Sequence, residues 1–201
     1  LPLDDNFRSI DYHKSFSFVE DAFENLWIVA WKGHLLSYDR KTEELVRMPL
    51  SKNLSKVTSI ICVRGDYLLM GGDEGLLMIK VDSDKNILEE HFIPGVTGVS
   101  TMVAHDGDVY AGTWRDGLYR YKFGESNPSF KRLNNVPFTD ILDLYLDPVN
   151  DELWVVSGEA VGLFKDSPVM TVPASANLRV ESLELDRNGG AYFTTGSEIF
   201  F

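Results

Sequence analysis

The chain has 201 residues, 44 % of them hydrophobic and 25 % charged, as is typical of a globular domain. Its 19 Lys and Arg stand against 31 Asp and Glu, and the net charge of −12 at pH 7 opposes binding to nucleic acid or to anionic lipid. No apolar run approaches the length of a membrane span, so we expect no membrane insertion by this segment.

A pattern of roughly forty residues recurs along the chain. Each copy has an apolar or aromatic pair after a short polar turn, and the second members of these pairs lie at intervals of 41, 42, 44 and 38 residues: Trp27, Leu68, Tyr110, Trp154 and Tyr192. Each copy divides into short alternating or β-branched runs separated by Asp, Gly, Asn and Pro. Four strands, here named a to d, repeated at this period predict an all-β fold, a β-propeller of four-stranded antiparallel blades.

In chain order, we expect the copies at about residues 12–50, 57–93, 99–133 and 140–173 to supply complete blades of one domain, 1–201. The third copy gives strands at Val99 to Ala104, Val109 to Thr113, Leu118 to Lys122 and Ser129 to Leu133. The fifth copy, 180–201, supplies strands a to c, and the short run at 6–11 would supply strand d. The sequence therefore predicts either five blades closed by the N-terminal strand or a fragment of a larger propeller, and it is compatible with both.

The turns between strands b and c superpose under the repeat, so they are expected at one end of the blades, together with the connections between strand d and the next strand a. The predicted ligand-binding residues of these turns are Trp31, Lys32, Asp73, Glu74, Trp114, Arg115, Asp116 and Glu159. Trp31 and Trp114 stand where a polar residue is usual, and an exposed Trp beside charged residues suits a sugar-stacking or peptide-anchoring site. Packing of the Trp rings against neighbouring blades is the alternative.

The connections from strand d to strand a add Lys52, Asn53, Thr97, Phe138, Thr139 and Asn177, of which Phe138 is the predicted third aromatic of the site. Trp27, Tyr110, Trp154 and Tyr192 recur at blade spacing, so core packing is expected for them.

No metal site or cofactor is predicted. The four histidines fall in different copies without metal-ligand spacing, and the lone Cys62 is expected to be a buried structural thiol. A catalytic alternative rests on four carboxylates near the starts of strands a, since glycosidases use facing carboxylate pairs: Asp140, Asp143, Glu181 and Glu184.

Three runs carry a family resemblance: VYAGTWRDGLYRYK, NLWIVAWKGHLLSYDRKT and VESLELDRNGGAYFTT. They resemble the two-component regulator propeller repeat, with its Leu-Trp-Ile-Gly-Thr and Gly-Leu-x-Arg-Tyr segments. The third copy matches best, with Gly112-Thr113 and Gly117 to Tyr121 in the family's places. The fourth departs from the pattern, because Val155-Val156-Ser157 stands where Ile-Gly-Thr is usual. These motifs specify blade structure and are weakly specific for function.

The resemblance implies a periplasmic sensor propeller of a hybrid histidine kinase, a family whose propellers commonly have seven blades and often respond to saccharides. From it we expect a non-catalytic recognition module whose partner is an oligosaccharide, another small molecule or a protein domain. A structural propeller that mediates protein contacts or homodimerisation and a glycosidase-type enzyme are the alternatives.

Overall fold

The computed structural model describes residues 16–105, 107–123, 129–147, 149–164, 170–171, 182–185, 191–194 and 199–200. Every regular element in these ranges is a strand, and all pairings are antiparallel. The chain divides into two units between Val99 and Ser100, and each is described by itself.

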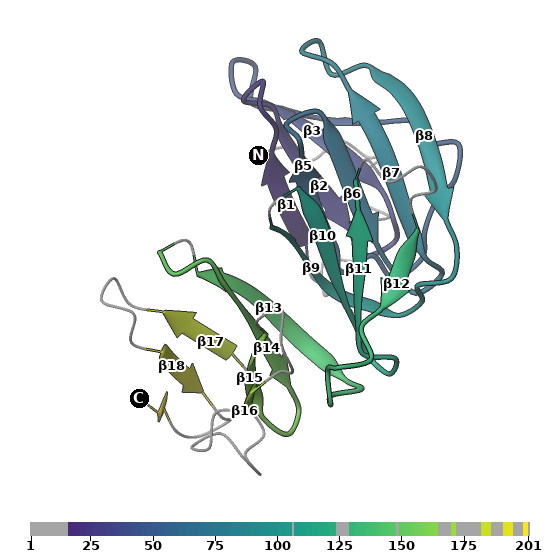
Figure 1. Ribbon diagram of the computed structural model, residues 1–201. Coiled ribbons are helices and arrows are strands. Elements are labelled where there is room, and N and C mark those ends of the chain that lie inside the picture. Colours follow the sequence, from purple (N-terminus) through teal and green to yellow (C-terminus); the bar gives the residue numbers. More distant parts are fainter. Residues whose placement is uncertain are drawn as a thin grey trace. The chain divides into compact units, whose positions relative to one another are not determined.

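Unit 1 consists of two four-stranded sheets in which neighbouring strands follow one another in sequence (Figure 1). Blade 1 contains β1 (Phe16–Glu20), β2 (Leu26–Ala30), β3 (Leu35–Asp39) and β4 (Glu44–Arg47). Blade 2 contains β5 (Ser59–Val63), β6 (Tyr67–Gly71), β7 (Leu76–Val81) and β8 (Ile87–Ile93). Residues 39–48 and 82–91 have a composition that favours a helix, but they form the hairpins between strands c and d, because a single apolar stripe of that length does not sustain a helix.

Unit 2 repeats the plan. Blade 3 contains β9 (Val99–His105), β10 (Asp108–Thr113), β11 (Leu118–Lys122) and β12 (Phe130–Arg132). Blade 4 contains β13 (Ile141–Asp147), β14 (Glu152–Ser157), β15 (Val161–Phe164) and β16 (Met170–Thr171). A three-stranded sheet follows, with β17 (Ser182–Leu185), β18 (Ala191–Thr194) and β19 (Ile199–Phe200). The predicted strand at 6–11 lies outside the described residues, so the closure of a fifth blade stays a prediction.

The core of unit 1 lies between its two sheets. Alternate residues of each strand face inward, so Trp27 and Val29 of blade 1 pack with Leu68 and Met70 of blade 2. Trp27 is 0 % exposed. Burying a side chain such as Val29, Leu68 or Met70 contributes about 1.5–3 kcal/mol, and this burial is the force that stacks one blade on the next.

Unit 2 has an equivalent core between blades 3 and 4, in which Tyr110 packs with Leu144, Leu153 and Phe164. The Tyr110 and Phe164 rings meet edge to face, with their centroids 5.8 Å apart. Phe138, which the sequence suggests as a ligand-contacting aromatic, belongs to this core and is only 9 % exposed. Its connection runs over the end of the blade, so the ring turns inward and covers apolar neighbours.

The hydrogen bonds that close each b–c turn define which residues are equivalent. Ala30, Gly72, Thr113 and Ser157 each donate the main-chain N–H across the turn. Counting back three residues aligns Trp27, Leu69, Tyr110 and Trp154, so Leu69 rather than Leu68 occupies the repeating position of the second copy.

The expected core role of this column holds for Trp27 and Tyr110, which are both buried. Trp154 is half-buried, and Tyr192 of the three-stranded sheet is 37 % exposed. The part of that sheet that the structure describes leaves the ring of Tyr192 partly open to solvent, so core packing is wrong for this residue.

Among the described a–b and c–d turns, four are closed by an aspartate carboxylate, and we call these the aspartate turns; their residues are Asp21, Asp39, Asp82 and Asp147. Asp21 Oδ1 accepts N–H groups of Phe23 and Asn25, and Oδ2 accepts the Asn25 side-chain amide and the Trp27 indole N–H at 2.8 Å. Asp82 and Asp147 accept main-chain and Asn side-chain donors in the same way. Each turn therefore satisfies its own polar groups.

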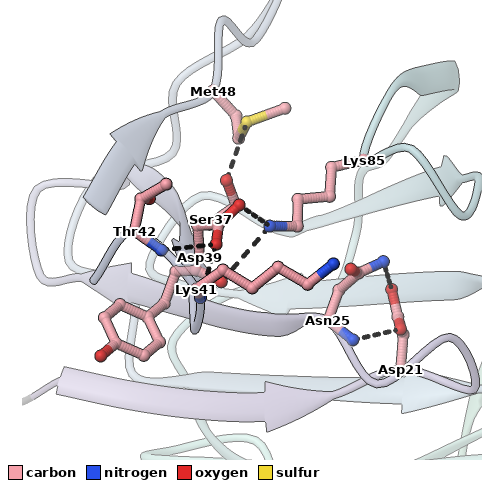
Figure 2. A network of polar contacts seen from close by, with 9 residues as sticks. Asp21, Asn25, Ser37, Asp39, Lys41, Thr42, Met48 and Lys85 are labelled. Carbon is pink, nitrogen blue, oxygen red and sulfur yellow. Dashed lines mark hydrogen bonds and ion pairs between the residues drawn. The ribbon is translucent and has the colours of Figure 1, made fainter. Parts of the chain in front are cut away.

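A lysine ties the two blades of unit 1 together at this end. Figure 2 shows Lys85 of blade 2 reaching the c–d turn of blade 1, where its Nζ lies 3.6 Å from Asp39 Oδ2 and 3.5 Å from the Tyr38 carbonyl oxygen. The N–H groups of Thr42 and Lys41, donating to Asp39, are the main reason that the pKa of this carboxyl lies below its usual range.

Candidate functional site

In unit 1 the b–c turns and the d–a connection lie together, as the repeat predicts. The connection 48–58 joins blade 1 to blade 2, and Val57 N–H donates to the carbonyl of Trp31 at 2.9 Å. Asp73 N–H donates to the Ser55 carbonyl of the same connection at 3.2 Å. Both turns are thus fixed by main-chain atoms, which leaves their side chains available for other contacts.

Gly33 is required by this arrangement. Its φ is +79°, and a Cβ built on it would lie 1.9 Å from the carbonyl oxygen of Leu54 in the 48–58 connection. Only glycine combines this left-handed backbone with so close an approach.

In unit 2 the b–c turns are held in the same manner. Gly117 N–H donates to the Thr139 carbonyl at 2.8 Å, and Gly158 N–H donates to the carboxylate of Asp140 at 3.0 Å. The Arg132 side chain donates to the Asp116 carbonyl at 2.8 Å, which adds a bond from strand d of the same blade.

The side chains on the b–c turn of blade 2 are already paired. Asp73 accepts from Lys56 Nζ at 2.5 Å, and Glu74 accepts from the Ser55 hydroxyl at 2.7 Å. Both partners come from the 48–58 connection. The charge of Asp73 is thus compensated and Glu74 has a hydrogen-bond partner, so both carboxylates of this turn are already engaged.

The b–c turn of blade 1 has one half-buried and one exposed side chain. The Trp31 ring is half-buried, whereas Lys32 is exposed, and both residues make further contacts. The half-buried ring is consistent with the packing alternative for Trp31 more than with a fully open stacking platform.

The b–c turn of blade 3 presents a different surface. The Trp114 side chain is 43 % exposed, and Arg115 beside it is exposed as well. Asp116 accepts from the Tyr119 hydroxyl and lies 3.3 Å from Arg132 Nε. Burial and the neighbouring Asp116 raise the pKa of Tyr119 to about 12, so the hydroxyl stays protonated and keeps donating. An exposed aromatic ring therefore lies next to a positioned carboxylate and an exposed guanidinium.

Blade 4 contributes one predicted residue, Glu159, whose side chain is exposed. Its N–H and that of Ala160 donate to the Ser157 hydroxyl, which orders the turn. The predicted site residues thus occupy b–c turns in both units, and Phe138 alone among them lies in a core.

Sequence reasoning missed Ser55, Lys56, Tyr119 and Arg132, the partners of the predicted acidic residues. Tyr119 and Arg132 are opposite each other in the pairing of β11 with β12, so a correct register for this hairpin would have indicated their contact. Lys56 meets Asp73 where the 48–58 connection continues the register of the β5–β6 hairpin, in which Ser59 is opposite Gly71, so that register would have indicated this contact as well.

The described carboxylates of the catalytic alternative have structural partners. Asp140 accepts from Gly158 N–H, and Asp143 accepts from the Thr101 hydroxyl at 3.2 Å and from Leu144 N–H at 2.8 Å. Glu181 and the side chain of Glu184 lie outside the described residues. Of the two that are described, Asp140 therefore holds the b–c turn of blade 4, and Asp143 joins β13 to β9.

Cys62 is half-buried against the core of unit 1. Burial, followed by the nearby charge of Asp21, raises the pKa of its thiol to about 11, which disfavours the reactive thiolate. Within the described ranges, no three His, Cys, Asp or Glu side chains gather as metal ligands, and no helix could cross a membrane.

Comparison with solved structures gives clear matches. The extracellular domain of a protein described as a hybrid two-component system of B. thetaiotaomicron matches with a TM-score of 0.72 and 21 % identity, over 91 % of this chain and 25 % of that one. The chain has a β-propeller fold. A second hybrid two-component system of that organism matches with a TM-score of 0.65 and 19 % identity, over 85 % of this chain and 24 % of the other.

Virginiamycin B lyase from Staphylococcus aureus matches with a TM-score of 0.68 and 13 % identity, over 92 % of this chain and 65 % of the enzyme. The propeller architecture is thus shared by sensor domains and by a lyase, and at these identities the likeness concerns the fold. No model of a protein family matches the sequence, and neither does any curated protein. The chain spans about a quarter of the length of the sensor domains, whose fold supports the resemblance drawn from the repeat.

Proposed function

We propose that this chain is the recognition part of an extracytoplasmic, periplasmic sensor and binds a small ligand of the saccharide class without catalysing its conversion. The observation that carries the proposal is the b–c turn of blade 3, where the exposed ring of Trp114 stands beside Arg115 and Asp116. The matches to extracellular domains of two-component systems support the sensing role and the location.

The chemistry of this turn suits a sugar. A pyranose ring presents C–H groups on its faces and hydroxyls on its rim, so it stacks on an indole while its hydroxyls bond to charged groups. Asp116 is fixed by Tyr119 and Arg132, and the Gly117 N–H is bonded to Thr139. A turn that is ordered before binding loses little conformational entropy when the ligand arrives.

The test is isothermal titration calorimetry of the protein against a panel of neutral and acidic oligosaccharides. We expect at least one of them to bind, with Trp114→Ala weakening it about tenfold or more, which corresponds to about 1.4 kcal/mol. Phe23→Ala is the matched control, because Phe23 is 44 % exposed but lies in an a–b turn of unit 1.

Equal binding by Trp114→Ala and wild type would remove the turn of blade 3 from the site. Absence of any response to the panel would remove the saccharide class. The titrated mixtures also report on catalysis, because cleaved sugar in them would overturn the non-catalytic assignment and favour a glycosidase.

A contact surface between proteins is the second candidate function, favoured by Phe18. This residue is 71 % exposed on β1, an edge strand of its sheet, where its ring is accessible to a partner. Sedimentation velocity at micromolar concentration would show a dimer that Phe18→Ser dissociates; a wild-type monomer would speak against self-association.

A further inference from the structure

A hollow of about 320 Å³ lies where strand d of blade 1 runs into the 48–58 connection, and it is lined by Arg47, Met48, Pro49, Leu50 and Asn53. This volume is at the lower end of the range of small-molecule sites. Met48 and Leu50 are half-buried against the core of unit 1, so they give the hollow an apolar floor. Arg47 and Asn53 are exposed and supply its polar groups.

The hollow carries positive charge in a protein whose net charge is −12. Among the described residues Arg47 forms no ion pair. The charges of Arg47 and Lys32 both reach His34, where, after burial, they help to hold the pKa of the imidazole below its ordinary value. Lys52 is nearby in sequence, with its ammonium 3.3 Å from the centre of the Phe92 ring.

The carboxylate of Glu90 bonds to Ser51 of the 48–58 connection. Both oxygens of Glu90 accept from Ser51 N–H, at 3.2 and 2.9 Å, and Oε2 also accepts from the Ser51 hydroxyl at 2.6 Å. Glu90 is therefore engaged in holding the connection, and the Arg47 guanidinium keeps its donors for another anion.

We propose that this hollow binds a small organic acid, with the carboxylate on the Arg47 guanidinium and the apolar body of the acid over Met48 and Leu50. A guanidinium forms two parallel hydrogen bonds to a carboxylate, a geometry that lysine cannot reproduce. The apolar floor selects against small inorganic anions, which have no surface to bury there. Asn53 adds an amide at the rim. This site is separate from the saccharide site proposed on blade 3 and does not depend on it.

The test uses hexanoate as the probe and backbone amide shifts in ¹H–¹⁵N NMR spectra as the readout. Hexanoate is expected to shift the amides of Met48, Leu50 and Asn53 saturably. Acetate, which lacks the apolar body, and hexanol, which lacks the charge, should each bind at least about tenfold more weakly, a difference of about 1.4 kcal/mol.

Arg47→Gln should weaken hexanoate binding about tenfold or more, and Arg47→Lys should restore only part of it. Arg40→Gln is the matched control, since Arg40 lies in the turn of the same β3–β4 hairpin and its loss changes the net charge equally. The amide spectrum of each variant shows whether its fold is intact.

Unchanged binding by Arg47→Gln, equal binding of acetate or hexanol, or shifts confined to other residues would each overturn the proposal. Trp114→Ala should bind hexanoate as the wild type does. Failure of the saccharide site and failure of this site are therefore distinguished by different variants.

Discussion

The two ends of the hairpins are stabilised in opposite ways. At the end of the a–b and c–d turns, aspartate side chains bond to main-chain groups of their own turn, as Asp21 does. At the end of the b–c turns, main-chain groups bond to the neighbouring connection, as Trp31 and Gly117 do. The aspartate side chains are needed for structure at the first end, whereas at the second end some side chains, such as Trp114, are not needed to hold the turn. We therefore expect mutations at the first end to change stability and mutations at Trp114 to change binding.

The largest effect should come from Gly33→Ala, which would show that the main chain of the binding end is essential to the fold. The added Cβ would overlap the Leu54 carbonyl in a left-handed backbone, and we expect a loss of about 3 kcal/mol or more in the free energy of unfolding. Urea unfolding measures it.

Gly107→Ala is the control for this substitution. Its φ is +76°, close to that of Gly33, but nothing lies within 4 Å of an added Cβ. The cost there should be about 1 kcal/mol, from backbone conformation alone. Equal losses for the two glycines would mean that the contact with Leu54 is unimportant.

Asp21→Ala should have the next largest effect and act on stability alone. It leaves the buried Trp27 indole N–H and two main-chain N–H groups without their acceptor, which should cost about 2–3 kcal/mol. Thermal unfolding would show the loss, whereas ligand binding should be unaffected below the transition. Asp82→Ala, in an exposed turn with similar bonds, should lose less.

Low pH should reduce the stabilisation that the aspartate turns give to the folded protein. Hydrogen bonds to Asp39, Asp82 and Asp147 lower the pKa of each carboxyl in the folded state. The folded protein thus binds these protons more weakly than the unfolded chain, so their stabilisation is present above about pH 4 and is lost as the pH falls further. Urea unfolding at pH 6 and at pH 3 checks this; equal midpoints would contradict it.

The smallest effect on stability should come from Trp114→Ala, within about 0.5 kcal/mol of wild type because the ring is an exposed surface side chain. Lys56→Gln breaks an exposed ion pair and should cost less than about 1 kcal/mol. A large loss of stability in Trp114→Ala would contradict the comparison of the two ends, because it would mean that the Trp114 ring packs against the fold.

The strands were predictable because alternation and turn residues are local signals. The strand c of the third copy was expected at Leu118 to Lys122 and is found there. The position of the b–c turns beside the d–a connections also followed from the repeat. The direction of Phe138 did not, because nothing near it in sequence distinguishes a loop aromatic that faces solvent from one that covers a core.

Contacts across blades were beyond local reasoning for the same reason. Ser51 of the 48–58 connection bonds to Glu90 on β8, 39 residues further along the chain, and this separation carries no sequence pattern. The hollow at Arg47 likewise depends on how the connection 48–58 leaves strand d, which the sequence describes only as a polar segment with one proline.

The main-chain anchoring of the b–c turns has an evolutionary consequence. In blades 1 to 3 main-chain amide and carbonyl groups bond each b–c turn to the neighbouring connection, and these groups do not depend on the side chains at the turn positions that carry no left-handed glycine. Substitution at positions such as Trp31, Glu74 or Trp114 therefore leaves the anchor intact. Successive copies of the repeat can diverge there one residue at a time, so a new specificity is reachable through folded intermediates.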